Sequence, residues 1–314
     1  MTLKQLQEDI LKLKNQNDVT ILAHYYQPIE IQEIADYLGD SLGLSRIAKT
    51  KATTENILFA GVVFMAETAS ILNQDKHVYI PSPEALCPMA AFLKPKMVSD
   101  FRKKYPGLPV VTYVNSTAAV KAVSDICCTS SNAVNIAKTI REEFKTDSIL
   151  FGPDANLADY VEQISKIKTI KMPKNGHCYV HSQMAAEDIE KSRKLHPNAK
   201  VLVHPECKRE VRELADVVGS TAHMYNYIRD SGLEEKEFII GTEKGLMERM
   251  AQDFPDKKYF MATDKLICYN MKKNTLELTK YVLENLDDKT FEIKVPPEIA
   301  KKAIIPINKM LEIS

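Results

Sequence analysis

Short apolar runs alternate with longer amphipathic stretches along most of the chain. The runs at residues 21–27, 110–116 and 201–207 begin with aliphatic side chains and end in polar groups. Between such runs lie segments with a helical spacing of apolar residues, for example residues 133–144 and 245–254. Buried strands that alternate with helices are typical of βαβ units and of a parallel sheet covered by helices on both faces. The pattern therefore predicts an α/β fold.

This pattern occurs three times. The marker residues His24, Tyr113 and His204 stand at matching places in the three runs, 89 and 91 positions apart. The same intervals separate a second set of landmarks, Asp36, Asp125 and Asp216. Self-similarity at a fixed interval indicates a repeated structural unit. We expect three pseudo-symmetric, three-layer αβα domains of about 90 residues, each with a short parallel sheet of roughly four strands.

The repeats divide the chain into predicted segments. The domains are placed at residues 18–95, 96–187 and 188–280, with helical terminal segments at residues 1–17 and 281–314. The last segment predicts an amphipathic helix that closes the fold, with the N-terminal helix as its candidate neighbour.

Polar side chains gather where the first strand of each unit ends. In open parallel sheets, ligands bind beyond the carboxyl ends of the strands, which makes these residues candidates for a substrate site. The candidates are His24, Tyr26, Tyr113, Asn115, His204 and Glu206.

Hydroxyl residues follow at the next strand-to-helix transition of each unit. They are Ser41, Ser130, Ser220 and Thr221. Hydroxyl and amide groups at the positive end of a helix can hold an anion. The alternative is that each serves only as a helix N-cap, but their equivalent positions in three repeats favour a common anion site.

One cysteine recurs in every repeat. Cys87, Cys178 and Cys268 are 91 and 90 positions apart, and each follows the fourth strand-like run of its unit. If the units surround a pseudo-threefold axis, the three thiols reach a common centre. Cys127, Cys128 and Cys207 have no such counterparts, and we interpret the Cys127–Cys128 pair as a packing element.

Three thiolates suit iron, copper or zinc far better than magnesium or calcium. A [4Fe–4S] cluster normally takes four thiolates, so three would leave one iron with an exchangeable position that can act as a Lewis acid. Zinc with three cysteines is an alternative, although the local CxxC spacing of zinc modules is missing. The remaining alternative is three buried core cysteines, which their equivalent placement disfavours.

The composition narrows the class of ligand. The 314 residues are 45% hydrophobic and carry 42 basic and 42 acidic side chains, so no net positive field is available to attract nucleic acid or an anionic membrane. No apolar run reaches membrane-spanning length, and the N-terminal stretch lacks the apolar core of a secretory signal. We therefore expect a cytoplasmic protein with a small-molecule partner and reduced cysteines. Standard dinucleotide and ATP phosphate loops are missing.

The ordered motifs resemble those of the quinolinate synthase A family. The resemblance runs from about residue 18 to residue 275 and includes AHYYQ, GDSLGLS, CPMA, YVNST, GHCYVH, HPEC, GTEKG and CYNM. It implies three α/β domains around a pseudo-threefold axis and a [4Fe–4S] cluster held by Cys87, Cys178 and Cys268. It also implies the condensation of iminoaspartate with dihydroxyacetone phosphate to quinolinate in NAD biosynthesis, with release of phosphate and water, and a functional link to an enzyme that supplies iminoaspartate.

For that reaction we assign roles to the strand-end residues. Tyr26 and Glu206 are predicted as the acid/base pair. His24 and His204 would donate hydrogen bonds to phosphate or carboxylate, and Tyr113 and Asn115 would orient the reacting carbons. We count His204 and Tyr113 among the catalytic candidates, and the hydroxyl residues would bind anionic groups. Two other hypotheses remain: a zinc-dependent lyase or aldolase that uses the same cysteines, and a metabolite-binding protein without catalytic activity.

Overall fold

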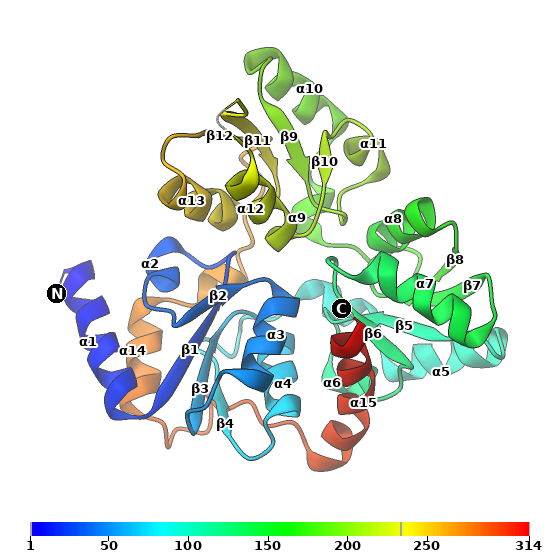
Figure 1. Ribbon diagram of the computed structural model, residues 1–314. Helices are drawn as coiled ribbons and strands as arrows, with labels where there is room; N and C mark the ends of the chain where they lie inside the picture. Colours follow the sequence, from blue (N-terminus) through cyan, green and yellow to red (C-terminus); the bar gives the residue numbers. More distant parts are fainter. Residues whose placement is uncertain (1, 233, 314) are drawn as a thin grey trace.

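The computed structural model, which describes residues 2–232 and 234–313, consists of three α/β units arranged in a triangle (Figure 1). Each unit has one sheet of four parallel strands. The strand orders are β2-β1-β3-β4, β6-β5-β7-β8 and β10-β9-β11-β12, which are the same order three times. Helices flank every sheet. The prediction of three pseudo-symmetric αβα domains is therefore confirmed, and each sheet is drawn from one of the three predicted segments.

The elements follow one another in the same sequence in each unit. The first unit contains α1 (Leu3–Gln16), β1 (Val19–His24), α2 (Ile29–Gln32), β2 (Tyr37–Gly39), α3 (Ser41–Thr50), β3 (Asn56–Ala60), α4 (Val63–Leu72), β4 (His77–Tyr79) and the 3-10 turn η1 (Pro88–Phe92). The second contains α5 (Pro95–Lys104), β5 (Val110–Tyr113), α6 (Ala118–Lys121), β6 (Ile126–Cys128), α7 (Ala133–Phe144), β7 (Ser148–Gly152), α8 (Ala155–Ser165), β8 (Lys168–Lys171) and α9 (Tyr179–Ser182). The third contains α10 (Ala186–Leu195), β9 (Lys200–Val203), α11 (Arg209–Arg212), β10 (Val217–Val218), α12 (Thr221–Asp230), β11 (Glu237–Gly241), α13 (Lys244–Asp253), β12 (Lys258–Met261) and η2 (Met271–Lys273). The chain ends with α14 (Leu276–Glu284) and α15 (Pro297–Ile313).

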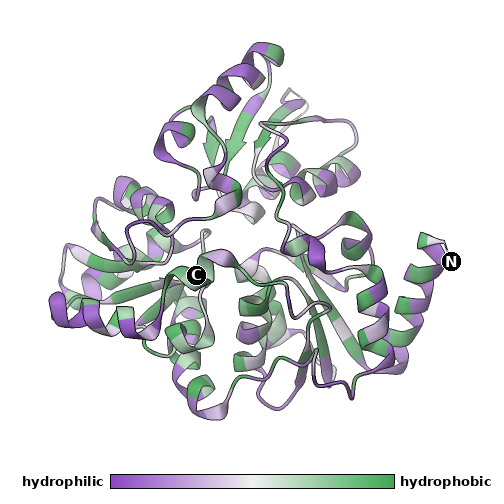
Figure 2. Cartoon of the chain, turned by 180° about the vertical axis from the view of Figure 1, so that it is seen from behind, coloured by the Kyte–Doolittle hydropathy of each residue, from purple (hydrophilic) through white to green (hydrophobic). Residues whose placement is uncertain are grey.

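Burial on both faces explains the apolar runs. All six residues of β1 are buried, because β1 pairs in parallel with β2 on one side and with β3 on the other and helices cover both faces. Figure 2 shows hydrophobic strands inside each unit and hydrophilic outer helices. The chain reverses its direction of winding between the first and third strands of each sheet, and ligands of such sheets bind beyond the carboxyl ends at that point.

The landmark aspartates have a structural role. The Oδ2 of Asp36 accepts a hydrogen bond from the backbone N–H of Ile21 at 2.8 Å. Asp125 and Asp216 make the equivalent bond at 2.7 Å to Val110 and Val201. Each carboxylate thus ties the turn before the second strand to the first strand, which explains its recurrence without any part in chemistry.

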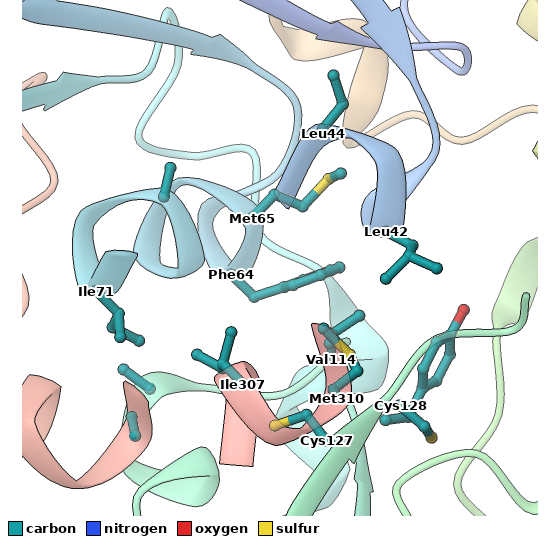
Figure 3. Packing of buried hydrophobic residues seen from close by; sticks show 14 of the residues in the cluster. Leu42, Leu44, Phe64, Met65, Ile71, Val114, Cys127, Cys128, Ile307 and Met310 are labelled. Atoms are coloured by element: carbon teal, nitrogen blue, oxygen red, sulfur yellow. The ribbon is translucent and has the colours of Figure 1, made fainter. Parts of the chain in front are cut away.

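The first and second units share a continuous hydrophobic core. Phe64 and Met65 of α4 pack in one cluster with Cys127 and Cys128 of β6. Ile307 and Met310 of α15 fill the space between them (Figure 3). The prediction that Cys127 and Cys128 serve packing agrees with their complete burial.

The terminal helices do not pack together. Helix α15 lies against β6, α6 and α4, whereas α1 packs against α14 (Figure 1). The expectation that the last helix neighbours the first was wrong, because the C-terminal helix covers the seam between two units. Within residues 2–232 and 234–313, no helix combines the length and apolarity required to cross a lipid bilayer.

Candidate active site

A cavity lies where the three units meet, beyond the carboxyl ends of the strands. The polar residues predicted from the sequence that line this cavity are His24, Tyr26, Ser41, Tyr113, Asn115, Ser130, His204, Glu206 and Thr221. Cys87, Cys178 and Cys268 line the same cavity, together with apolar residues such as Met65 and Phe64. Side chains separated by about 90 positions thus meet at one place, as the register of the repeats predicted.

The cysteines are arranged alike in the three units. Each lies beyond the fourth strand, at or just before a short helical turn. The backbone N–H three residues further on points at the sulfur, and these donors belong to Ala90, His181 and Met271. Burial raises the pKa of all three thiols, and the neighbouring Cys268 raises that of Cys87 and Cys178 further. The sulfurs are therefore close enough to influence one another's charge.

The hydroxyl residues separate into two groups. The N-cap of α3 is Asp40, so Ser41 is the first helical residue, and it lines the cavity. Ser130 precedes α7, whose N-cap is Asn132. Ser220, by contrast, caps α12 by accepting the N–H of His223 and lies in the groove next to the cavity. Ser220 therefore serves as a helix N-cap, while Ser41, Ser130 and Thr221 remain candidates for anion binding.

Glu206 lies at the centre of the polar groups. Its Oε1 accepts a hydrogen bond from the hydroxyl of Tyr113 at 2.5 Å, and its Oε2 lies 2.7 Å from Nδ1 of His181. Burial disfavours the charged carboxylate, but the hydrogen bonds that it accepts from His181 and Tyr113 favour it and hold the pKa of Glu206 below its usual value. Glu206 is consequently ionised at neutral pH.

A hydroxyl links Tyr26 to this carboxylate. Thr242 Oγ1 lies 2.7 Å from the hydroxyl of Tyr26 and 2.9 Å from Nε2 of His181. Because Nδ1 of His181 donates to Glu206, Nε2 is left to accept from Thr242, and Thr242 accepts from Tyr26. Thr221 donates to the Tyr26 oxygen at 3.2 Å. Burial raises the pKa of Tyr26 well above its usual value, so the phenol is protonated.

His24 and His204 occupy equivalent positions with equivalent bonds. Nδ1 of His24 accepts the backbone N–H of Tyr26 at 3.1 Å, and Nδ1 of His204 accepts that of Glu206 at 3.3 Å. Burial lowers the pKa of both imidazoles to about 3. Both rings are therefore neutral, with the ring proton on Nε2 available as a donor.

Asn115 has an unsatisfied acceptor. Its Oδ1 is buried and has no hydrogen-bond partner among the described residues. A buried amide oxygen without a partner costs free energy unless a ligand or water supplies a donor. This agrees with a role for Asn115 in orienting a bound molecule.

His181 and Thr242 belong to this group of polar residues, although neither is predicted from the sequence. His181 stands three positions after Cys178, one helical turn away, so the spacing GHCYVH places both side chains toward the same side. Thr242 follows the third strand of its unit directly. Its position at a strand's carboxyl end was the signal that could have identified it.

The remaining cysteines lie outside the cavity. Cys127, Cys128 and Cys207 are fully buried, and the Cys207 thiol lies 3.7 Å from the carbonyl oxygen of Gly241.

The family model described as quinolinate synthetase A protein matches residues 8–312. The chain belongs to this family. Among its relatives, a quinolinate synthase of Pyrococcus abyssi is 47% identical over 307 residues, covering 98% of this chain and 99% of the relative. A quinolinate synthase of Thermotoga maritima is 46% identical over 312 residues, with 98% and 99% coverage. One of Thermococcus kodakarensis is 45% identical over 314 residues, with both chains covered completely.

The match to the quinolinate synthetase A family includes all three units. Cys87, Cys178 and Cys268 and every residue that lines the cavity fall within residues 8–312. The resemblance inferred from the motifs is therefore confirmed over nearly the whole chain.

Proposed function

We propose that this chain is a quinolinate synthase of NAD biosynthesis, which condenses iminoaspartate with dihydroxyacetone phosphate and releases phosphate and water. The names of its relatives support this activity. The observation that carries the proposal is the cavity itself, where one cysteine from each unit meets neutral imidazoles, hydroxyls and an ionised carboxylate. Such a set can bind anionic substrates and move protons between them.

The cysteines fit an iron–sulfur cluster by their donor chemistry. Three half-buried thiols with raised pKa values meet at one place, and a metal centre would supply the positive charge that stabilises their thiolates. The N–H groups directed at the sulfurs are typical stabilising partners of cluster thiolates. We propose that Cys87, Cys178 and Cys268 hold a [4Fe–4S] cluster, which would supply a Lewis-acidic iron with an open position.

The protein's own groups can bind the substrates. The Nε2–H groups of His24 and His204 are donors that stay neutral, so they can bind a carboxylate or phosphate without forming a competing ion pair. The hydroxyls of Ser41, Ser130 and Thr221 add further donors along the cavity. Asn115 can accept from a substrate hydroxyl or imine N–H through its free Oδ1.

Proton transfer is assigned to Glu206 and Tyr26. The ionised Glu206 accepts a proton from substrate carbon during enolisation, and the protonated Tyr26 donates one. The hydrogen bonds from Tyr26 through Thr242 and His181 to Glu206 join the two groups. The donors along this path all point from Tyr26 towards Glu206, so they help to keep the carboxylate ionised and able to accept a proton from substrate.

The experiment that tests the function is turnover by the anaerobically purified chain. We expect about four irons and four sulfides per chain, and formation of quinolinate from dihydroxyacetone phosphate and iminoaspartate generated in the assay by a separate aspartate-oxidising enzyme. We propose that a similar enzyme supplies iminoaspartate to this chain in the cell. We also propose that the reaction takes place in the cytoplasm. Binding of labelled dihydroxyacetone phosphate without its consumption would instead indicate a metabolite-binding protein.

One observation favours a second candidate. A sulfur of Cys178, a ring nitrogen of His181 and a carboxylate oxygen of Glu206 lie within 4.8 Å of one another, and such a mixed donor set suits zinc. A zinc-dependent lyase or aldolase would be colourless and contain stoichiometric zinc. A brown protein with iron and sulfide would exclude it.

A further inference from the structure

The segment that carries each cysteine is fixed to the rest of its unit by the same backbone bond. The first N–H of the helix after the third strand donates to the carbonyl two residues before the cysteine. These bonds are Val63 to Ala85 at 2.9 Å, Ala155 to Gly176 at 2.8 Å and Lys244 to Leu266 at 3.0 Å. In the second unit the approach is so close that a Cβ on Gly176 would overlap the carbonyl oxygen of Pro153.

In the second and third units, a hydrogen bond to a carboxylate also holds the segment that carries the cysteine. The Oδ2 of Asp154 accepts the backbone N–H of Cys178 at 3.0 Å, while its Oδ1 caps α8 through the N–H of Leu157 at 2.7 Å. The carboxylate of Asp154 thus spans the helix start and the cysteine.

Glu243 repeats the arrangement in the third unit. Its Oε1 accepts the N–H of Cys268 at 3.0 Å, and its Oε2 caps α13 through the N–H of Gly245 at 2.7 Å. The equivalent residue of the first unit is Val62, which caps α4 without a side-chain bond. The segment that carries Cys87 therefore has the backbone hydrogen bond but no carboxylate bond.

Capping alone does not explain these carboxylates. Asp154 and Glu243 are both completely buried, and a buried carboxylate costs free energy that a serine or asparagine cap would avoid. A carboxylate has two acceptor oxygens that can serve two N–H donors in different directions, which a single hydroxyl cannot do to the same extent. The second oxygen is used for the cysteine in both units.

We propose that Asp154 and Glu243 are positioning residues that anchor Cys178 and Cys268, leaving Cys87 as the least constrained of the three thiols. The purpose of the anchoring, a fixed metal-binding geometry, rests on the proposed function, whereas the anchoring itself does not. Each carboxylate acts through the backbone of its cysteine and touches no substrate.

The test compares Asp154→Asn with Glu243→Gln in the full-length, metal-free chain under reducing, anaerobic conditions. Asparagine is as good an N-cap as aspartate, but its single oxygen can serve either the helix or the cysteine N–H. The probe is iodoacetamide, and the rate of alkylation of each cysteine is followed by mass spectrometry. The Asp154 variant is the cleaner of the two, because Glu243 also pairs with Lys272 at 2.9 Å.

Each variant should expose its own cysteine. We expect alkylation of Cys178 to be about tenfold faster in Asp154→Asn, and that of Cys268 about tenfold faster in Glu243→Gln, as expected for the loss of one buried hydrogen bond to local opening. The other two cysteines of each variant serve as internal controls and should react at unchanged rates. In the unaltered chain, Cys87 should react first.

Two results would overturn the proposal. Unchanged alkylation in both variants would mean that the carboxylates are helix caps and nothing more. A rise at all three cysteines together would mean that the substitution loosens the whole cavity. Because no metal is present, neither result depends on whether the chain is a quinolinate synthase. In chain loaded with iron and sulfide, release of iron to a chelator should be faster in Asp154→Asn than in the unaltered protein.

Discussion

The hydroxyl of Tyr26 lies 2.7 Å from Oγ1 of Thr242, although the two residues are 216 positions apart in the chain. Tyr26 follows the first strand of the first unit, and Thr242 follows the third strand of the third unit. The bond joins two units directly beside the cavity, which Tyr26 lines. It also completes the path of hydrogen bonds from the phenol to the carboxylate of Glu206.

Thr242→Val should reduce quinolinate formation without loss of metal. Valine fills the space of threonine but can neither donate to His181 nor accept from Tyr26, and we expect kcat to fall by about 100-fold, the lower end of what a positioned acid or base contributes. Thr242→Ser keeps the hydroxyl and should retain most of kcat. The comparison is made by steady-state kinetics at matched iron content. Equal kcat values for the two variants would show that the Thr242 hydroxyl has no part in catalysis.

Glu206→Gln should separate binding from catalysis. Glutamine retains the size of the side chain and one oxygen for the hydrogen bond from Tyr113, but it cannot accept a proton from substrate. We expect unchanged iron and sulfide content and a kcat lowered by at least about 100-fold. A normal turnover rate in this variant would show that another group is the base.

Cys178→Ala should abolish quinolinate synthesis and lose the cluster. Cys127→Ala is the control, because Cys127 of β6 lies in the hydrophobic core and away from the cavity. The control should keep its iron and activity while losing about 1 kcal/mol of stability to the small cavity. Iron and sulfide analysis of both proteins decides the matter. Full iron content in the Cys178 variant would refute its assignment as a ligand.

The register of the repeats explains why much of the site could be predicted. Carboxyl ends of parallel strands share one edge, so equivalent positions in three sheets around one axis must meet. This places His24, Tyr113 and His204 together and brings in one cysteine per unit. The period of the repeat is sufficient for this prediction, and side-chain contacts are not required.

Contacts between units could not be predicted in this way. Thr242 meets Tyr26 and His181 only because the first, second and third units pack at particular angles. The docking of α15 over the seam between the first and second units is likewise a matter of packing, since its amphipathic pattern fits several partners. The apolar pattern of a helix predicts which of its faces is buried, but it does not predict which element packs against that face.

Acid should destabilise the metal-free chain through its buried histidines. Burial lowers the pKa of His204 to about 3, against 6.5 when unfolded. Below pH 6.5 the unfolded state therefore binds a proton that the native state does not, and stability falls by about 1.4 kcal/mol per pH unit for this group. Above pH 6.5 the effect is absent.

Unfolding by urea between pH 5 and pH 8 measures this slope. The window avoids Glu206, whose lowered pKa acts only below its unfolded value of 4.5. His204→Gln should flatten the dependence below pH 6.5 by one proton. Parallel curves for the two proteins would contradict a neutral His204 in the native state.

Arg212→Met should destabilise the junction between the second and third units. Arg212 of α11 is buried and donates to Asp159 of α8 at 2.6 Å and to the carbonyl oxygens of Asn156 and Pro205. Its loss should cost about 3 kcal/mol. Arg209→Met is the control, since Arg209 binds the same carboxylate from a half-exposed position and should cost less than about 1 kcal/mol. Thermal unfolding compares the two, and equal shifts would show that burial does not matter here.

The three units differ at the position where their first strand ends. This residue is histidine in two units, His24 and His204, and tyrosine in the other, Tyr113. Three identical chains around a threefold axis would offer a bound ligand three equivalent orientations. When the three units belong to one polypeptide, the residues of each unit can change independently. The side chains that line the cavity are therefore not related by threefold symmetry, and an asymmetric molecule bound there would meet a different set of groups at each of its ends.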